Sequence, residues 1–158
     1  MELAGIILNE YENTPILDRP QEICVDVIGI GAGVVDRLIE LDLPARGINV
    51  AESASLGDKY MRLRDELWGR AREWFEAKEC VIPDDAALIA ELAAPRFSFT
   101  STGKIKIESK DEMRKRGIRS PDIADAFCLT FAGNAIAAAH GSRYGWRGTI
   151  DVDTSWVV

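Results

Sequence analysis

Two carboxylates near the C-terminal end of the chain have the residue type and the spacing of a cation site. Asp122 and Asp125 follow Ser120 and Pro121, which favour the cap and the first turn of a helix. Residues three apart on a helix share one face, so both carboxylates project in the same direction. An acidic first turn is ordinary in a helix. The residues that follow, to about position 139, are however largely apolar, and carboxylates at the root of a buried helix need a cation or hydrogen-bond donors.

Asp26 is a third candidate, because it stands in the middle of the apolar run 23–30, which is typical of a buried strand. Taken alone, it is slightly better explained as a structural acid that accepts nearby backbone N–H groups. Together with the helix pair it supplies the hard oxygen ligands that two-metal hydrolysis of a phosphodiester requires. We therefore predict that Asp26, Asp122 and Asp125 are catalytic and bind Mg²⁺ or Mn²⁺. The single histidine, His140, offers little material for a histidine-based site.

The segment 104–119 is a candidate DNA-binding region. It carries seven basic and three acidic side chains, a net charge of +4, within a chain whose net charge is −7. A run of charges is often only a solvated face. Next to the carboxylates, however, it predicts that a phosphate backbone is held near a metal. The candidate DNA-binding residues are Lys104, Lys106, Lys110, Arg114, Lys115, Arg116 and Arg119.

The elements that must position these residues alternate between helix and strand, which predicts one α/β domain. Helical periodicity covers residues 2–12, 34–41, 58–78, 86–93 (capped by Asp84 or Asp85) and 121–139. Strands are expected at 23–30 and 47–52, and a hairpin joins 96–100 to 104–108.

Length and composition point to the cytoplasm. The 158 residues contain no apolar run of membrane-spanning length and no signal-peptide pattern. Cys24, Cys80 and Cys128 are far apart in apolar surroundings and are predicted to be buried free thiols. We therefore expect a cytoplasmic protein without a membrane partner.

The glycines at positions 29, 31 and 33 offer an alternative function, because a glycine-rich loop between a strand and a helix can bind a dinucleotide. The third glycine of that fingerprint is replaced by Val34. We interpret the loop as a tight turn with a close backbone approach. A small nucleotide-binding α/β domain remains the weaker alternative.

Four blocks carry a resemblance to a known family. They are VDVIGIGAGVVDRL (25–38), GINV (47–50), IESKDEM (107–113) with Arg116-Gly117, and SPDIADA (120–126) with LTF (129–131). In order and spacing, over about residues 3–133, they resemble the C-terminal nuclease domain of the large terminase subunit of tailed bacteriophages and prophages.

The resemblance implies an RNase H-like, RuvC-type three-layer α/β domain with a mixed central sheet. It also implies a metal-dependent endodeoxyribonuclease that cuts concatemeric double-stranded DNA during packaging, together with an ATPase motor domain, a small terminase subunit and a portal. Asp26 then corresponds to the second-strand metal ligand, and Asp122 to the acid of the last helix with Asp125 as its companion.

The chain departs from this family in two respects. It has no GxxxxGK[ST] loop, so the ATPase motor is absent. It also begins at the helix that should follow the first three strands, and the first of these carries a further catalytic Asp. We therefore expect an N-terminally incomplete nuclease domain at 1–140 and a tail or arm at 141–158. The gap predicts weak metal binding, weak or absent cleavage, and a homodimer through the exposed strand edge. A catalytically dead remnant, or a DNA-binding and assembly module, is the alternative.

Overall fold

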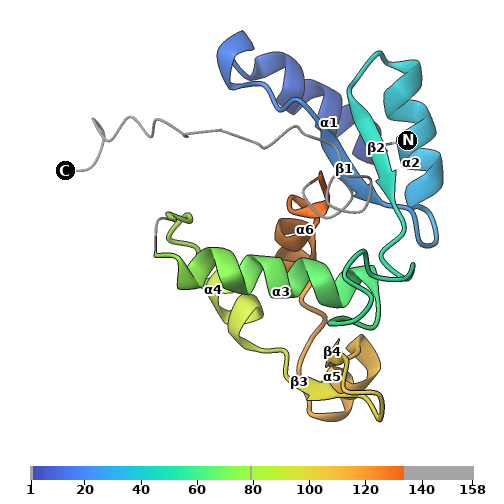
Figure 1. Ribbon diagram of the computed structural model, residues 1–158. Coiled ribbons are helices and arrows are strands. Elements are labelled where there is room, and N and C mark those ends of the chain that lie inside the picture. Colours follow the sequence, from blue (N-terminus) through green and yellow to red (C-terminus); the bar gives the residue numbers. More distant parts are fainter. Residues whose placement is uncertain (1, 79, 134–158) are drawn as a thin grey trace.

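The computed structural model describes residues 2–78 and 80–133, and its α/β architecture confirms the predicted fold class (Figure 1). The helices are α1 (Glu2–Asn13), α2 (Gly31–Glu40), α3 (Leu63–Glu76), α4 (Ala86–Ala93), α5 (Lys110–Lys115) and α6 (Asp122–Leu129), with a 3-10 turn at Ile16–Asp18. The strands are β1 (Ile23–Asp26), β2 (Ala45–Ile48), β3 (Phe97–Phe99) and β4 (Ile105–Ile107). The expected tail at 141–158, His140 and the helix beyond residue 133 lie outside the described residues.

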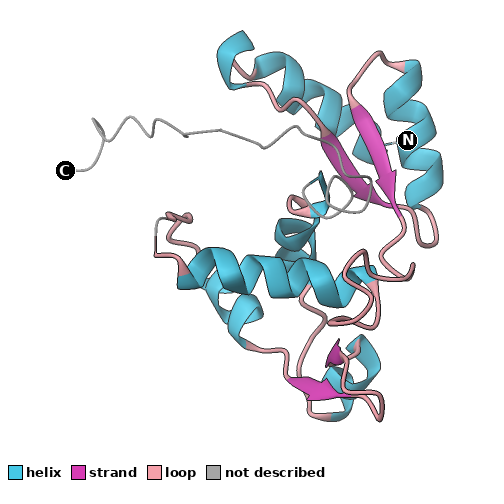
Figure 2. Ribbon diagram, in the orientation of Figure 1, coloured by secondary structure: helices cyan, strands magenta, loops and turns pink. Residues whose placement is uncertain are grey.

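The described strands form two small sheets, where one mixed sheet was expected (Figure 2). β1 and β2 are parallel, with Ile23 opposite Ala45 and Asp26 opposite Ile48. β3 and β4 form the predicted antiparallel hairpin. The hairpin packs on α3, where the buried Asp65 accepts the backbone N–H of Ile107 at 2.8 Å.

The parallel strands lie between helices, as parallel sheets require. α2 packs on β1 and β2, and α1 packs on α2. α6, which comes from the C-terminal part of the described chain, also contacts β1. Ala4, Leu38 and Leu43 form the buried cluster between α1, α2 and the sheet. The periodicity of residues 2–12 is therefore confirmed as a helix whose apolar side faces α2.

β1 ends at Asp26, so the prediction of a strand through residue 30 is wrong for its second half. The Oδ1 atom of Asp26 accepts the N–H of Ile28 at 3.0 Å, and Gly29 has φ 77°. A side chain at Gly31 would overlap the carbonyl oxygen of Asp26, so only glycine allows this close approach. The loop is the tight turn that we inferred.

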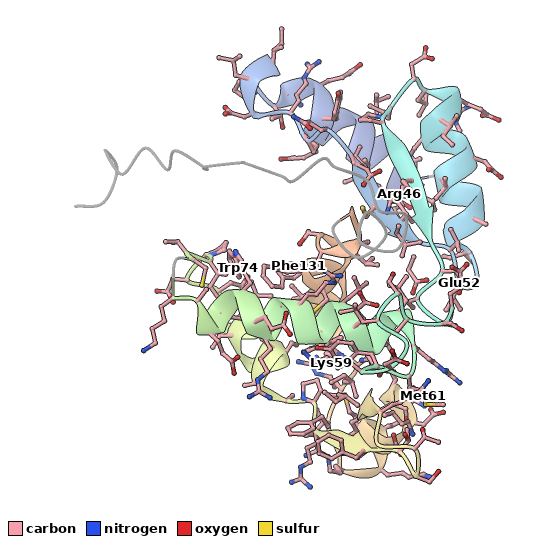
Figure 3. All side chains as sticks on the ribbon, in the orientation of Figure 1. Arg46, Glu52, Lys59, Met61, Trp74 and Phe131 are labelled. Atoms are coloured by element: carbon pink, nitrogen blue, oxygen red, sulfur yellow. The ribbon has the colours of Figure 1, made fainter. Side chains whose placement is uncertain are left out.

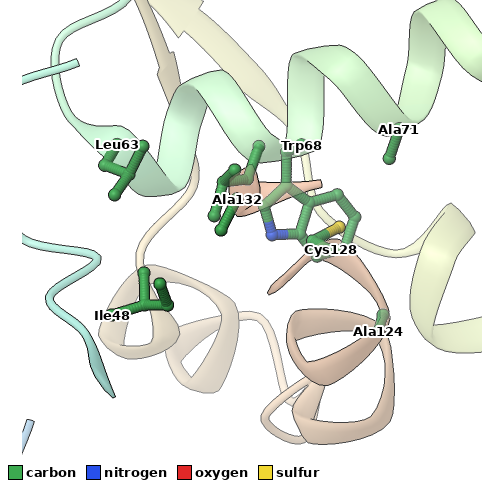
Figure 4. Close-up of a cluster of buried hydrophobic side chains, with 8 residues drawn as sticks. Ile48, Leu63, Trp68, Ala71, Ala124, Cys128 and Ala132 are labelled. Carbon is green, nitrogen blue, oxygen red and sulfur yellow. The ribbon is translucent and has the colours of Figure 1, made fainter. Parts of the chain in front are cut away.

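A second core joins α3, α6 and β2 (Figure 4). Trp68 lies between the helices and is almost fully buried. The other buried members are Ile48, Leu63, Leu67, Ala71, Ala124, Cys128 and Ala132. α3 begins at Leu63, later than the predicted residue 58, because the Asp65 carboxylate accepts the backbone N–H of Arg62 at 2.9 Å and so fixes the start of the helix. This core fixes the position of α6, and with it the acidic pair, relative to α3.

Candidate functional site

One cavity of about 790 Å³ brings the three predicted carboxylates to a common wall. Asp26 reaches it from the end of β1, and Asp122 and Asp125 from the first turn of α6. The basic residues that line it are Arg62, Arg64, Lys106 and Lys110. Among the described residues, no three acidic, histidine or cysteine side chains converge as a ready metal cluster. The structure therefore places the predicted acids in one cavity without joining them in one ligand set.

The start of α6 differs from the sequence prediction. Pro121 occupies the N-cap position, and the hydroxyl of Ser120 donates to Asp122 Oδ1 at 2.6 Å instead of accepting from the helix backbone. Glu91 on α4 supplies the cap, because its Oε2 atom accepts the N–H groups of Ile123 and Ala124 at 2.7 and 3.1 Å. A carboxylate from a neighbouring helix thus satisfies the first free donors of α6.

Asp122 faces solvent, with 73% of its side chain exposed. The Ser120 hydroxyl and the Lys110 ammonium, 2.9 Å from Oδ1, hold the pKa of Asp122 below its ordinary value. Because Asp122 is ionised and exposed, its carboxylate oxygens remain accessible to a cation from solvent.

Asp125 is held much more firmly, and only 20% of its side chain is exposed. Its Oδ1 atom accepts the Trp68 indole N–H at 2.9 Å and the Arg64 Nε–H at 3.2 Å. Its Oδ2 atom lies 3.2 Å from Lys110 Nζ. Both oxygens of Asp125 are therefore bound by groups from α3 and α5.

Lys110 is the cation that joins the two carboxylates. It is the first residue of α5, a helix that the sequence analysis did not predict and that Ser109 and Glu112 start with a capping box. Burial alone lowers the pKa of Lys110, but hydrogen bonds to Asp122 and the charge of Asp125 raise it above its ordinary value. Lys110 was predicted to bind DNA, and here it is an ammonium group bridging the acidic pair.

Asp26 has the structural role that its sequence position suggested, as an acceptor of a nearby backbone N–H. Its Oδ1 atom accepts the Ile28 N–H, which is the structural interpretation of this residue. It also lines the cavity and is only partly buried. The structural and the functional interpretations of Asp26 are thus compatible, since one carboxylate can serve both.

The other predicted DNA-binding residues fall into two groups. Arg116 is tied into the fold, because it donates to both carboxylate oxygens of Glu108 at 2.6 and 2.7 Å and to the Ala94 carbonyl. The hydrogen bond from Arg116 holds the pKa of Glu108 below its ordinary value. Arg114, Lys115 and Arg119 are exposed, while Lys104 and Lys106 are partly buried on the hairpin.

Sequence reasoning missed Arg64 and Trp68 as site residues. Their partner Asp125 lies 61 and 57 positions away along the chain, so no local spacing connects them. Trp68 was assigned only to the apolar stripe of its helix, which is also true, because its ring is buried in the core.

Cys128 lies on α6, three residues after Asp125, and is a buried free thiol. Burial and the charge of Asp125 raise its pKa to about 12, and burial likewise raises the pKa of Cys24 to about 11. All three cysteines are free as predicted, but only Cys128 is buried, since Cys24 and Cys80 are partly exposed. No described helix has the length and apolarity needed to cross a membrane.

No protein-family model matches the chain, and neither does any curated protein. Solved structures of the nuclease domain of the large terminase subunit gp2 of bacterial virus Sf6 do match. The chain is 22% identical to one of them, with a TM-score of 0.58, over 80% of this chain and 68% of that one. The fold is that of a terminase nuclease domain.

Two further structures of the same Sf6 domain match equally well. A lysine-to-alanine variant with manganese is 20% identical, with a TM-score of 0.59, over 80% of this chain and 69% of that one. A lysine-to-alanine variant with calcium has the same identity and TM-score and covers 68% of its chain. The terminase nuclease fold is RNase H-like, which is the fold that the family resemblance implied.

Proposed function

We propose that this chain is the metal-dependent endonuclease domain of a phage or prophage terminase large subunit. One observation carries the proposal: Asp122 and Asp125 hold a single cationic group between them, on the wall of a cavity that Asp26 also lines. The likeness of the fold to the Sf6 nuclease domain supports it.

The donor set fits a hard divalent cation. The Lys110 ammonium, 2.9 Å from Asp122 Oδ1 and 3.2 Å from Asp125 Oδ2, is a stand-in for a cation bound between them. Carboxylate oxygens are the ligands that Mg²⁺ and Mn²⁺ prefer. Asp26, Asp122 and Asp125 would hold the metal, which when bound supplies an activated water and stabilises charge on the scissile phosphate. The manganese and calcium in the Sf6 structures support this assignment.

The cations of the chain would hold the substrate, double-stranded DNA. Arg62 and Lys106 line the cavity itself and would bind phosphates next to the carboxylates. The DNA backbone farther along the duplex would be contacted by Lys104, Arg114, Lys115 and Arg119. Lys110 would contact DNA at the carboxylate cavity itself. We infer that the domain acts in the cytoplasm of a bacterial host and cuts concatemeric DNA during packaging, alongside an ATPase motor, a small terminase subunit and a portal.

Cleavage of supercoiled plasmid tests the proposal. With Mn²⁺ or Mg²⁺ we expect slow nicking, because Asp26, Asp122 and Asp125 line one cavity but, among the described residues, do not converge as one ligand set. Chelation with EDTA and the Asp122→Asn substitution should each abolish it. Asp111→Asn is the matched control, since Asp111 is exposed on α5 and pairs with Arg114. Nicking that survives Asp122→Asn would contradict the assignment of the site.

A second candidate function is a catalytically dead DNA-binding or assembly module. It is favoured by the state of Asp125, whose two oxygens are bound by Arg64, Trp68 and Lys110. This candidate predicts that the chain binds duplex DNA but neither nicks it nor binds Mn²⁺ in a calorimetric titration.

A further inference from the structure

The turn after β1 presents an apolar tip at the rim of the carboxylate cavity. Ile28 is 54% exposed and Ile30 is 87% exposed. Ile28 lines the cavity together with Asp26, and the exposed Met61 lines it as well. Figure 3 shows Met61 on the segment that leads from β2 to α3. Single exposed apolar residues are ordinary, but here several stand at the edge of a strongly charged cavity.

The carboxylate residue itself fixes the shape of this turn. Asp26 Oδ1 accepts the Ile28 N–H at 3.0 Å, and Gly29 reverses the chain at φ 77°. The Gly31 backbone packs directly on the Asp26 carbonyl, which leaves no space for a side chain at position 31. The isoleucines are thus held in a set position relative to Asp26, so little conformational freedom is lost when they contact a partner.

The charges around the turn select the chemistry of that partner. The cavity is lined by four cations and four carboxylates, and three of the cations are held in ion pairs. Arg62 is in none of the ion pairs of the described residues, so its guanidinium is the group that suits a phosphate backbone. Two isoleucines on one turn are far less than the roughly 800 Å² per partner of a stable protein interface. Isoleucine and methionine are among the side chains that insert between base steps and kink a duplex.

We propose that the turn carrying Ile28 and Ile30 is a wedge that enters DNA beside the carboxylate cavity and unstacks a base step. The choice of DNA as the ligand rests on the proposed function. The wedge makes the chain prefer DNA with unpaired bases, because the cost of unstacking is lowest there.

Fluorescence of 2-aminopurine in a short duplex tests this proposal with the full chain, in EDTA so that no cleavage occurs. We expect wild-type protein to increase the fluorescence and to bind a duplex with a central bubble about tenfold more tightly than a perfect duplex. The double variant Ile28→Ser/Ile30→Ser should lose both effects. Ile39→Ser is the control, since Ile39 on α2 is as exposed as Ile28 but does not line the cavity. Thermal melting of each variant shows whether it is folded.

The outcomes separate the wedge from the nuclease. A folded double variant that still unstacks DNA and prefers the bubble overturns the wedge, even if the protein cleaves plasmid. Wild-type protein that unstacks DNA but shows no metal-dependent nicking supports the wedge and contradicts the nuclease. Loss of self-association in the double variant, with DNA unstacking unchanged, would show that the turn contacts protein and would also overturn the proposal.

Discussion

Replacing Lys110 by methionine should strengthen metal binding, because the ammonium competes for the same oxygens. The Nζ atom lies 2.9 Å from Asp122 Oδ1 and 3.2 Å from Asp125 Oδ2. Both Lys110 and Asp122 are substantially exposed, so solvent screens each contact to about 0.2–1 kcal/mol. Together the two contacts amount to about 1 kcal/mol, which corresponds to a roughly fivefold lower Kd for Mn²⁺ in Lys110→Met. Methionine keeps an unbranched stem, so packing changes little.

Isothermal titration calorimetry of the full chain with Mn²⁺ measures this difference. Lys115→Met is the matched control, since Lys115 is an exposed lysine at the end of the same helix. It removes the same net charge from α5 without touching the acidic pair, so its Kd should stay near that of wild-type protein. If Lys110→Met binds Mn²⁺ no more tightly than Lys115→Met, the ammonium is not a competitor and the reasoning fails.

Three further predictions concern the fold around the site. Trp68→Phe should lower the free energy of unfolding by about 2 kcal/mol in chemical denaturation, because it removes the indole donor from the Asp125 carboxylate; an unchanged value would show that water replaces it. The pKa of Glu112 is lowered to about 2, chiefly by the Ser109 hydroxyl, so the stability from this cap is present above the ordinary value of 4.5 and is lost as the pH falls toward 2. An NMR titration of Ser109→Ala should show the pKa of Glu112 returning toward 4.5, and a value still near 2 would contradict this cause. Among the described residues β1 has a strand neighbour on one side, so light scattering at micromolar concentration should show a dimer, and a monomer would count against pairing through this edge.

Elements whose signals are local could be predicted from the sequence. Asp85 caps α4 as expected, because its side chain accepts the N–H groups of Ala87 and Leu88 two and three residues later. The hairpin also follows from nearby residues, since Gly103 has φ 79° in the turn that joins its strands. In both cases the residues that determine the geometry lie within a few positions of the element.

Helix starts set by distant partners could not be predicted. Ser120 is the natural cap in the sequence of α6, yet Glu91, 32 positions before Ile123, satisfies the helix donors. α5 was missed because six residues are too few for a clear helical period, although its capping box was present in the sequence. The end of β1 is set locally, by the Asp26 carboxylate on the Ile28 N–H and by the close approach of Gly31, but the apolar residues up to Ile30 continue the strand pattern and conceal it.

The candidate site shows how much a spacing argument can establish. Two acids three apart on one helical face are equivalent in the sequence, and both were predicted to bind metal. In the fold only Asp125 lies within reach of α3, where Arg64 and Trp68 bind it, whereas Asp122 meets Ser120 and Lys110 at the surface. A ligand exchange at Asp122 needs to displace one exposed ammonium and one hydroxyl, but at Asp125 it must also break contacts that hold α3 to α6. An incoming cation should therefore bind Asp122 first, and Asp125 should join as a ligand only after Lys110 has left its Oδ2 atom.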